Sequence, residues 1–125
     1  MTAGTRYHDW LVDLRRDLHR RPEPAWREFY TTARIVDELD DIGVDDLHVG
    51  PDVLDSDARL GVPDEAELSE WADRAIGAGA DESLVERMAG GNTGALAVLD
   101  RGEGPTVALR VDIDGLPRAE SDSPD

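Results

Sequence analysis

Two aspartates, Asp112 and Asp114, stand one residue apart at the end of an apolar run, residues 106–111. Side chains alternate along a strand, so both carboxylates should face the same side. Open α/β sheets place their sites at the carboxyl ends of strands. Carboxylates there can bind a divalent cation or orient a metal ligand. An ordinary solvated strand end would show the same pattern, so the two residues alone leave both interpretations open.

A β-hairpin is predicted to position these aspartates. Residues 93–99 and 106–111 are both rich in small, β-branched and apolar side chains, and residues 100–105 between them form a cluster of turn residues. Two such runs joined by such a loop are typical of a hairpin. The second run is almost entirely apolar, which predicts a central strand that is buried on both faces.

The residues before this hairpin predict a mainly helical region. Apolar side chains recur at helical spacing from Tyr7 to Leu18, and Pro22 ends that helix. A second helix is expected over residues 27–42, with Gly43 as its C-cap. A short strand over 44–49 and an irregular loop over 53–63 follow. Further helices are expected over 64–76 and 81–88, the first opened by a capping pair of Asp64 and Glu67.

The composition narrows the partners and the cellular setting. The chain of 125 residues has a net charge of −16, all of its basic residues are Arg, and it contains no Cys. This charge disfavours nucleic acid and anionic membranes as partners. Concentrated salt would screen the self-repulsion, so the acidity is interpreted as adaptation to a salty cytoplasm. An ordinary acidic surface or a disordered acidic tail is the alternative. No apolar run is long enough to span a membrane, and we expect a cytoplasmic protein.

Two motifs resemble a known family. Residues 14–19, followed by Pro22-Glu23, Glu28-Phe29 and Thr32-Ala33, resemble the opening helices of the aminoacylase/carboxypeptidase superfamily of metallopeptidases. Residues 104–117 resemble a strand of that family. The long insertion, about residues 51–90, and the approach to the hairpin through residues 90–94 resemble the p-aminobenzoyl-glutamate hydrolase branch. The similarity covers almost the whole chain.

The resemblance implies an α/β fold: the N-terminal part of a three-layer metallopeptidase catalytic domain, spanning residues 1–125, with two leading helices, a helical insertion, a β-hairpin and an incomplete sheet. The lid or dimerisation domain would be absent. Such enzymes hydrolyse N-acyl amino acids, here p-aminobenzoyl-glutamate-like small molecules, with two divalent zinc or manganese ions. In this branch the ligands and the general base would lie beyond Asp125. Asp112 and Asp114 would contact the metal-binding side chains without binding the metal themselves. No metal is expected to bind to this chain alone.

Two functional hypotheses remain open at this point. The chain is either the N-terminal fragment of a metal-dependent amidohydrolase, inactive by itself and able to form a homo- or hetero-oligomer, or a non-catalytic relic or interaction module. In the second case an unpaired sheet edge would bind another chain.

Overall fold

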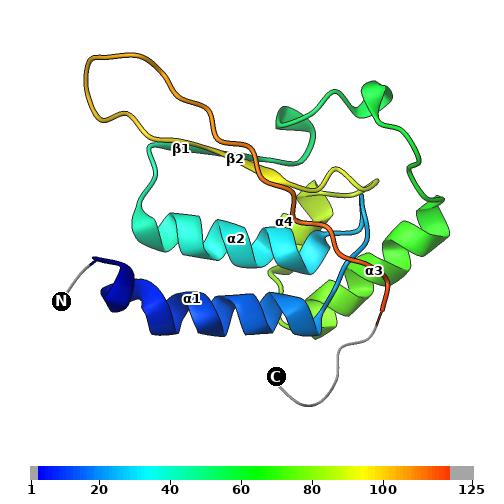
Figure 1. Cartoon of the computed structure of the whole chain (residues 1–125). Helices are drawn as coiled ribbons and strands as arrows, with labels where there is room; N and C mark the ends of the chain where they lie inside the picture. Colours follow the sequence, from blue (N-terminus) through cyan, green and yellow to red (C-terminus); the bar gives the residue numbers. More distant parts are fainter. Residues whose placement is uncertain (1–2, 119–125) are drawn as a thin grey trace.

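The computed structural model describes residues 3–118 and shows helices packed below a small sheet (Figure 1). Residues 1–2 and 119–125 of the predicted domain lie outside the described part. Two single-turn 3-10 helices, Gly50–Asp52 and Ser56–Ala58, interrupt the loop after the first strand. The remaining elements in chain order are α1 (Ala3–Arg20), α2 (Phe29–Ile42), β1 (Asp46–Val49), α3 (Glu65–Gly77), α4 (Glu82–Arg87) and β2 (Ala95–Val98).

The ends of α2 follow from local chemistry. Its first backbone N–H groups are satisfied by the carboxylate of Glu23, which accepts hydrogen bonds from the Tyr30 and Thr31 amides at 2.8 and 2.6 Å. At the other end Gly43 takes a left-handed conformation, φ 84°, and its N–H donates to the Leu39 carbonyl. The predicted C-cap is therefore confirmed.

Helix α1 is joined to α2 largely through polar side chains. The Trp10 indole N–H donates to Glu38 at 2.9 Å. One turn from the other end of α1, Asp17 accepts hydrogen bonds from the Tyr30 hydroxyl at 2.8 Å and from Arg34 Nε at 2.9 Å. These bonds hold the two helices side by side.

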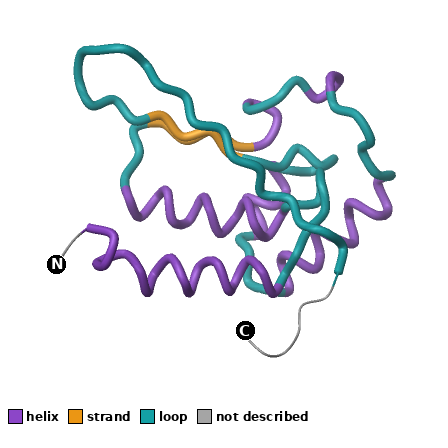
Figure 2. The backbone as a smooth tube through the Cα atoms, viewed as in Figure 1, coloured by secondary structure: helices purple, strands orange, loops and turns teal. Residues whose placement is uncertain are grey.

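The sheet pairs different segments from those predicted. β1 and β2 are antiparallel, with Asp46 opposite Val98 and Val49 opposite Ala95. The expected hairpin between residues 93–99 and 106–111 does not form, and β2 pairs with the earlier strand β1 instead. Residues 106–111 are extended and unpaired within the described chain (Figure 2), and they are exposed instead of buried on both faces. The prediction of an incomplete sheet holds.

Within the insertion, α3 and α4 confirm the two predicted helices. The Asp64 carboxylate caps α3 by accepting a hydrogen bond from the Glu67 amide at 2.9 Å. The reciprocal half of the expected capping pair is missing, because Glu67 bonds to Arg27 at 2.9 Å instead. This ion pair ties α3 to the turn before α2. In α4, the carboxylate of Asp81 caps the helix in the same way.

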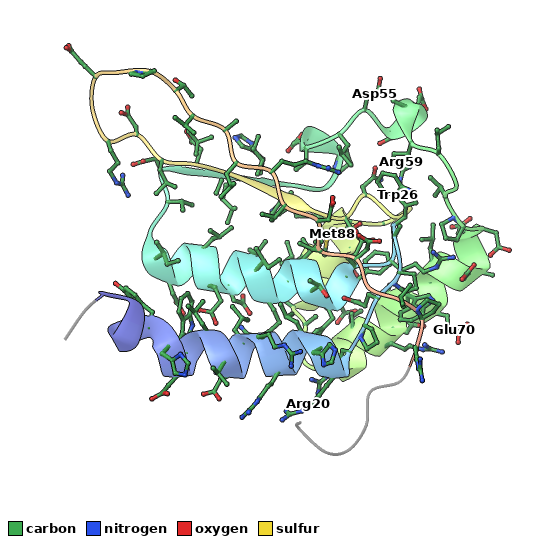
Figure 3. All side chains as sticks on the ribbon, in the orientation of Figure 1. Arg20, Trp26, Asp55, Arg59, Glu70 and Met88 are labelled. Atoms are coloured by element: carbon green, nitrogen blue, oxygen red, sulfur yellow. The ribbon has the colours of Figure 1, made fainter. Side chains whose placement is uncertain are left out.

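The hydrophobic core lies where α2 meets the insertion. Helix α2 contacts α3, α4 and β2. Met88, just after α4 (Figure 3), is completely buried, and Phe29 at the start of α2 is 1% exposed. The other buried apolar residues are Tyr30, Ala33, Val49, Leu68, Ala75, Leu84 and Val85. In the described part of the chain, no helix has the length and apolar character needed to cross a membrane.

Candidate functional site

Asp112 and Asp114 lie in the extended segment that returns over the start of α2. Both side chains are exposed, whereas Ile113 between them and Gly115 after them are half-buried. This alternation agrees with the expectation that the two carboxylates face one side. Asp112 forms an exposed ion pair with Arg110 at 2.8 Å. The segment ends against the turn between α1 and α2.

A cavity of about 410 Å³ separates this segment from the rest of the fold. Glu28, Asp112 and Asp114 all line it. Its other walls come from the Trp26 turn, from α2, from the loop after β1 and from the residues leading into β2. Three carboxylates that are far apart in the sequence therefore border the same space.

Glu28 is the buried member of this group. Its side chain accepts a hydrogen bond from the Arg27 amide at 2.8 Å and a longer one from the Thr93 hydroxyl at 3.3 Å. Burial raises the pKa of Glu28, and the negative charge of Asp114 adds to that rise, while the hydrogen bonds oppose it. Glu28 thus links the start of α2 to the entry to β2.

Glu23 is a second buried carboxylate, only 4% exposed. Besides capping α2, it accepts a 2.6 Å hydrogen bond from the Thr31 hydroxyl. Burial raises the pKa of Glu23 against the opposing effect of these donors. The backbone carbonyl of Glu23 also accepts a hydrogen bond from the Gly115 amide at 2.8 Å, which anchors the end of the aspartate segment.

Gly115 packs closely at that anchor. A Cβ atom there would lie 3.2 Å from Cβ of Pro22, closer than ordinary van der Waals contact. The glycine therefore allows the backbone after Asp114 to approach the turn between α1 and α2.

Trp26 fixes the same turn to the insertion. It has a positive φ of 67°, an uncommon conformation for a bulky residue. Its indole N–H donates to the Leu60 carbonyl at 2.7 Å, and the guanidinium of Arg59 lies 5.6 Å from its ring centre (Figure 3). Arg59 in turn donates to the Gly90 carbonyl at 2.8 Å. Trp26 therefore packs the turn before α2 against the insertion.

The residues present do not by themselves fit the pair of divalent ions that the family resemblance implies. Within residues 3–118, no three His, Cys, Asp or Glu side chains are grouped so that they could hold a metal ion. The three carboxylates at the 410 Å³ cavity border one space without forming a ligand set.

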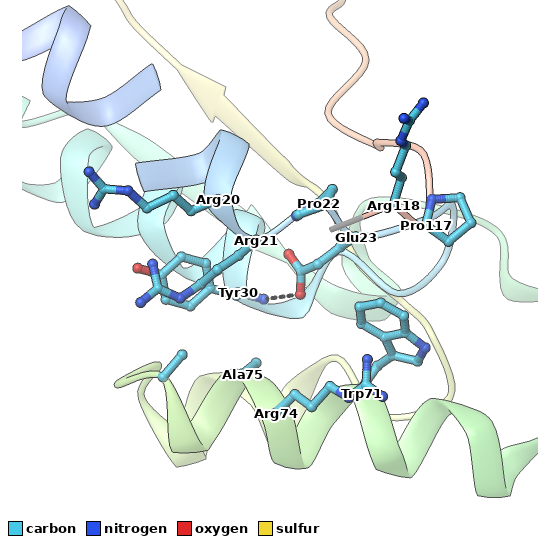
Figure 4. A pocket seen from close by; sticks show the side chains of 11 residues that line it. Arg20, Arg21, Pro22, Glu23, Tyr30, Trp71, Arg74, Ala75, Pro117 and Arg118 are labelled. Atoms are coloured by element: carbon cyan, nitrogen blue, oxygen red, sulfur yellow. Dashed lines mark hydrogen bonds between the residues drawn. The ribbon is translucent and has the colours of Figure 1, made fainter. Parts of the chain in front are cut away.

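A second cavity, of about 390 Å³, is bordered by Glu23 and Tyr30 (Figure 4). It is lined by Arg20, Arg21, Arg74 and Arg118. The side chains of Arg20 and Arg118 extend away from each other in Figure 4, so the arginines do not converge on one ligand. This cavity is therefore a weaker candidate than the space beside Asp114.

The sequence patterns indicated Asp112 and Asp114 as site residues and did not indicate Glu23 or Glu28. One signal was available: Glu23 stands between Pro22 and Pro24. Prolines lack an N–H donor and restrict the backbone, so an acid among them, just before a helix, is suited to capping that helix. The burial of Glu28 depends on Thr93, which lies 65 positions away.

Comparison with known proteins identifies homologues over most of the chain. It is 45% identical over 107 residues to the indole-3-acetyl-aspartic acid hydrolase of Enterobacter agglomerans, covering 85% of this chain and 24% of that protein. It is 39% identical over 111 residues to a p-aminobenzoyl-glutamate hydrolase subunit of Escherichia coli K12, covering 88% of this chain and 25% of that protein. No family model matches.

A solved structure has the same fold. The aminobenzoyl-glutamate utilization protein from Klebsiella pneumoniae superposes with a TM-score of 0.85 at 41% identity, covering 90% of this chain and 28% of that one. The chain thus spans about a quarter of the length of the relatives it matches. The resemblance to the p-aminobenzoyl-glutamate hydrolase branch is confirmed for that portion.

Proposed function

We propose that this chain forms the N-terminal part of an amidohydrolase that cleaves N-acyl amino acids. The observation that carries the proposal is the agreement of both sequence and shape with one part of the p-aminobenzoyl-glutamate hydrolase proteins. An identity of 39% extends over 88% of this chain. The backbone superposes on the Klebsiella pneumoniae protein with a TM-score of 0.85.

The names of two relatives narrow the substrate class. One is a hydrolase of p-aminobenzoyl-glutamate and the other a hydrolase of indole-3-acetyl-aspartic acid. Each compound joins an aromatic acyl group to an acidic amino acid through an amide bond. We infer that the complete protein hydrolyses an amide of glutamate or aspartate with such an acyl group. The Escherichia coli relative is named as one subunit of its hydrolase, which supports a partner subunit for the complete protein.

In this proposal the chain supplies support around the reacting groups, and does not bind the metal itself. Divalent zinc or manganese ions would supply an activated water in the complete protein. Asp112 and Asp114 lie at the rim of the 410 Å³ cavity, where they can accept hydrogen bonds from side chains that the remaining sequence supplies. Glu28 and its bond to Thr93 would keep the floor of that cavity in place.

A chimera tests this proposal. The stretch of the Escherichia coli hydrolase that this chain matches is replaced by residues 1–118, and the release of glutamate and aspartate is measured with p-aminobenzoyl-glutamate and indole-3-acetyl-aspartate. We expect activity from the chimera when metal and the partner subunit of the hydrolase are present, and none from the chain alone. An active isolated chain, or a folded but inert chimera, contradicts the proposal.

Asp114→Asn in the chimera tests the assigned support role. Loss of a residue that orients a metal ligand typically lowers activity by about 10- to 100-fold. Asp73→Asn is the matched control, because Asp73 is an exposed aspartate on α3. Equal activity of both variants would remove Asp114 from the site. A fall in activity without a change in the melting temperature would support its role.

The exposed apolar side chains of residues 106–111 favour a second candidate function, an interaction module without catalysis. This candidate requires a chain that is folded and soluble alone in multimolar salt, with no dependence on metal. Circular dichroism with and without a chelator separates the two candidates. A chain that unfolds or aggregates alone would rule out the module.

We also propose a cytoplasmic location, and we propose the adaptation to salt on the basis of charge. A net charge of −16 on 125 residues produces self-repulsion that screening reduces. We therefore expect the melting temperature of the chain to rise when the KCl concentration is increased from about 0.1 to about 2 M, as measured by circular dichroism. An unchanged or falling melting temperature contradicts the salt interpretation.

A further inference from the structure

The turn before α2 adopts a conformation that its own sequence does not favour. Trp26 has a positive φ of 67°, and bulky side chains rarely occupy that region. Such a conformation persists only where neighbouring contacts hold it, and it is found most often beside functional sites. The contacts that hold Trp26 come from Arg59 and Leu60 of the insertion, which the proposed function does not use. The insertion therefore acts on the turn that carries Glu28.

Arg59 of the insertion contacts three separate segments. Its guanidinium lies 5.6 Å from the ring centre of Trp26, in the turn before α2 (Figure 3). Its Nη1 donates a hydrogen bond to the carbonyl of Gly90, at 2.8 Å, in the stretch that leads into β2. Its Nε donates to the carbonyl of Ser56 at 3.0 Å, which fixes the arginine on its own loop. One half-buried side chain thus joins the insertion to the turn and to the start of the path into β2.

Residues 90–94, the approach to β2, fit closely against the same turn. A Cβ atom on Gly91 would lie 2.9 Å from the carbonyl oxygen of Trp26, a distance at which the backbone would have to shift. The φ of 80° at Gly91 is one that glycine adopts without strain. The next residue, Asn92, is 8% exposed, and its side chain accepts a 2.7 Å hydrogen bond from the Ser56 hydroxyl. The insertion loop therefore holds this approach at a second point.

Two hydrogen bonds to the Glu28 carboxylate depend on these segments. One comes from the amide of Arg27, which follows Trp26 in the chain. The other comes from the hydroxyl of Thr93, which follows Asn92. The Thr93 bond is 3.3 Å long, near the limit for a hydrogen bond, so a small shift of either segment would break it. Glu28 is 8% exposed and lines the 410 Å³ cavity, so such a shift would reach the candidate site.

Arg74 on α3 provides a comparison within the chain. Its guanidinium lies 4.5 Å from the ring centre of Trp71, so it makes the same kind of stack as Arg59. Its ion pair is with Glu70, one turn away, and both side chains of that pair are largely exposed. All of these contacts stay within one helix. A stack on tryptophan is therefore not what distinguishes Arg59, whose contacts join three segments.

We propose that Arg59 is a positioning residue of the candidate site. By holding the turn at Trp26 and the approach to β2 together, it keeps the Glu28 carboxylate in place. Glu28 lines the same cavity as Asp112 and Asp114, whereas Arg59 does not line it. Arg59 therefore acts through Glu28 and not on a bound substrate. This inference rests on the proposed function.

Kinetics of the chimera with the Escherichia coli hydrolase test this role, with metal and the partner subunit present and p-aminobenzoyl-glutamate as the substrate. Arg59→Met removes the stack and both hydrogen bonds. It should lower kcat by about 10- to 100-fold, because misplacing a group that supports a site has effects of that size. KM should stay within about twofold, since Arg59 lies outside the cavity.

Arg74→Met is the matched control, because it removes a stack on tryptophan that joins no other segment. It should change kcat and KM by less than about twofold. Equal losses of kcat in the two variants overturn the proposal, and so does a kcat that Arg59→Met leaves unchanged.

A double-mutant cycle in the chimera separates positioning from a purely structural effect. Glu28→Gln should lower kcat by a factor similar to that of Arg59→Met. In that background Arg59→Met should add less than about a further twofold, because both substitutions disrupt the same arrangement. Losses that multiply would show that Arg59 acts elsewhere and overturn the proposal. A Glu28→Gln variant with full activity overturns it as well.

Arg59→Lys takes the place of Arg59→Met if that variant does not fold. Lysine keeps the charge but not the planar group that stacks on Trp26 and donates to two carbonyls. A fall in kcat is again expected. Full kcat in Arg59→Lys, with Arg59→Met unfolded, would show that only the charge matters for the fold, and would overturn the positioning role.

Hydrogen exchange of the chimera, measured by mass spectrometry, tests the same contacts without catalysis. The amide of Gly94 donates to the Thr32 hydroxyl at 3.0 Å, so its exchange reports on the approach to β2. Peptides covering residues 90–94 should exchange at least about fivefold faster in Arg59→Met than in the parent chimera. In Arg74→Met they should exchange at the parent rate.

The exchange rates also separate this inference from the proposed function. Faster exchange in Arg59→Met, in a chimera that hydrolyses no substrate, supports the joining role of Arg59 and contradicts the proposed function. Unchanged exchange in Arg59→Met overturns the inference whether or not the chimera is active.

Discussion

β2 and residues 106–111 are similar in composition but differ in structure. Both are short runs of small, β-branched and apolar residues. β2 forms an antiparallel ladder with β1, whereas residues 106–111 form no ladder within the described chain. The difference lies in the partner, since β2 pairs with β1 and residues 106–111 pair with no strand within the described chain. A strand is thus a property of a pair of segments, and composition identifies only the candidates.

The contrast extends to what each region contributes to stability. The body around α2 buries its apolar side chains against α3, α4 and β2. The extended segment keeps its side chains in solvent and is held at its end by one backbone hydrogen bond to Glu23. The first region should therefore respond strongly to substitution and the second weakly.

The largest effect is expected from Phe29→Ala. Phe29 is 1% exposed in the core, so its truncation should lower the free energy of unfolding by about 3–5 kcal/mol. Urea denaturation followed by circular dichroism measures this change. Leu109→Ala in the isolated chain is the control and should change stability by less than about 0.5 kcal/mol. Similar losses from both would erase the distinction between the two regions.

Gly50→Ala should have the next largest effect. Gly50 has a positive φ of 70°, and an added Cβ would lie 2.5 Å from the carbonyl oxygen of Arg87. We expect a loss of about 2–3 kcal/mol from conformational strain and steric overlap together. Gly61 has the same φ but open space around it, so Gly61→Ala should lose only about 1 kcal/mol. Equal losses would show that the contact with Arg87 is unimportant.

Asp17→Asn probes the polar join between α1 and α2. Burial pushes the pKa of Asp17 upward, but the hydrogen bonds from Tyr30 and Arg34 and the charges of Arg21 and Arg34 outweigh it and lower that pKa. The ionised carboxylate therefore stabilises the fold above its ordinary pKa of 3.8, and this contribution is lost as the pH falls through the lowered value.

The variant should lose about 1–2 kcal/mol at pH 7. On acidification, the free energy of unfolding of the variant should also fall by less than that of the wild type. Urea titrations at neutral pH and at a pH below the ordinary value of 3.8 measure both. Asp13→Asn, an exposed position on the same helix, should behave like the wild type. A pH dependence that Asp17→Asn leaves unaltered would contradict this account.

The smallest effect is expected from Asp112→Asn in the isolated chain. The pair of Asp112 and Arg110 is exposed on both sides, at 67% and 86% of the side chains. Exposed ion pairs of this kind contribute about 0–1 kcal/mol. A change in the free energy of unfolding below the precision of the measurement is expected. A loss of more than about 1 kcal/mol would show that the extended segment is part of the folded core.

The helices were predictable because each depends mainly on neighbouring residues. The apolar spacing of α1 and α2, the Gly43 cap and the Asp64 cap are all local features. The pairing of β2 with β1 was missed because it joins segments about 50 residues apart, and a shorter loop suggested the wrong partner.

Some features of the candidate site could likewise be predicted from local sequence, and others could not. The alternation that places Asp112 and Asp114 on one side follows from their spacing along the chain and could be predicted. The burial of Glu28 depends on Thr93, and the position of the segment depends on the bond from Gly115 to Glu23. Both contacts are set by tertiary structure, which local patterns do not contain.

The bond between Gly115 and Glu23 has a consequence for the order of folding. It joins positions about 90 residues apart, and closing so long a loop costs entropy that grows slowly but steadily with its length. Contacts of this range tend to form after the local helices are in place. On a ribosome, Glu23 emerges long before Gly115, so the helices can assemble while the aspartates are still being synthesised. Asp112 and Asp114 would then reach the cavity only after the helices that border it have formed.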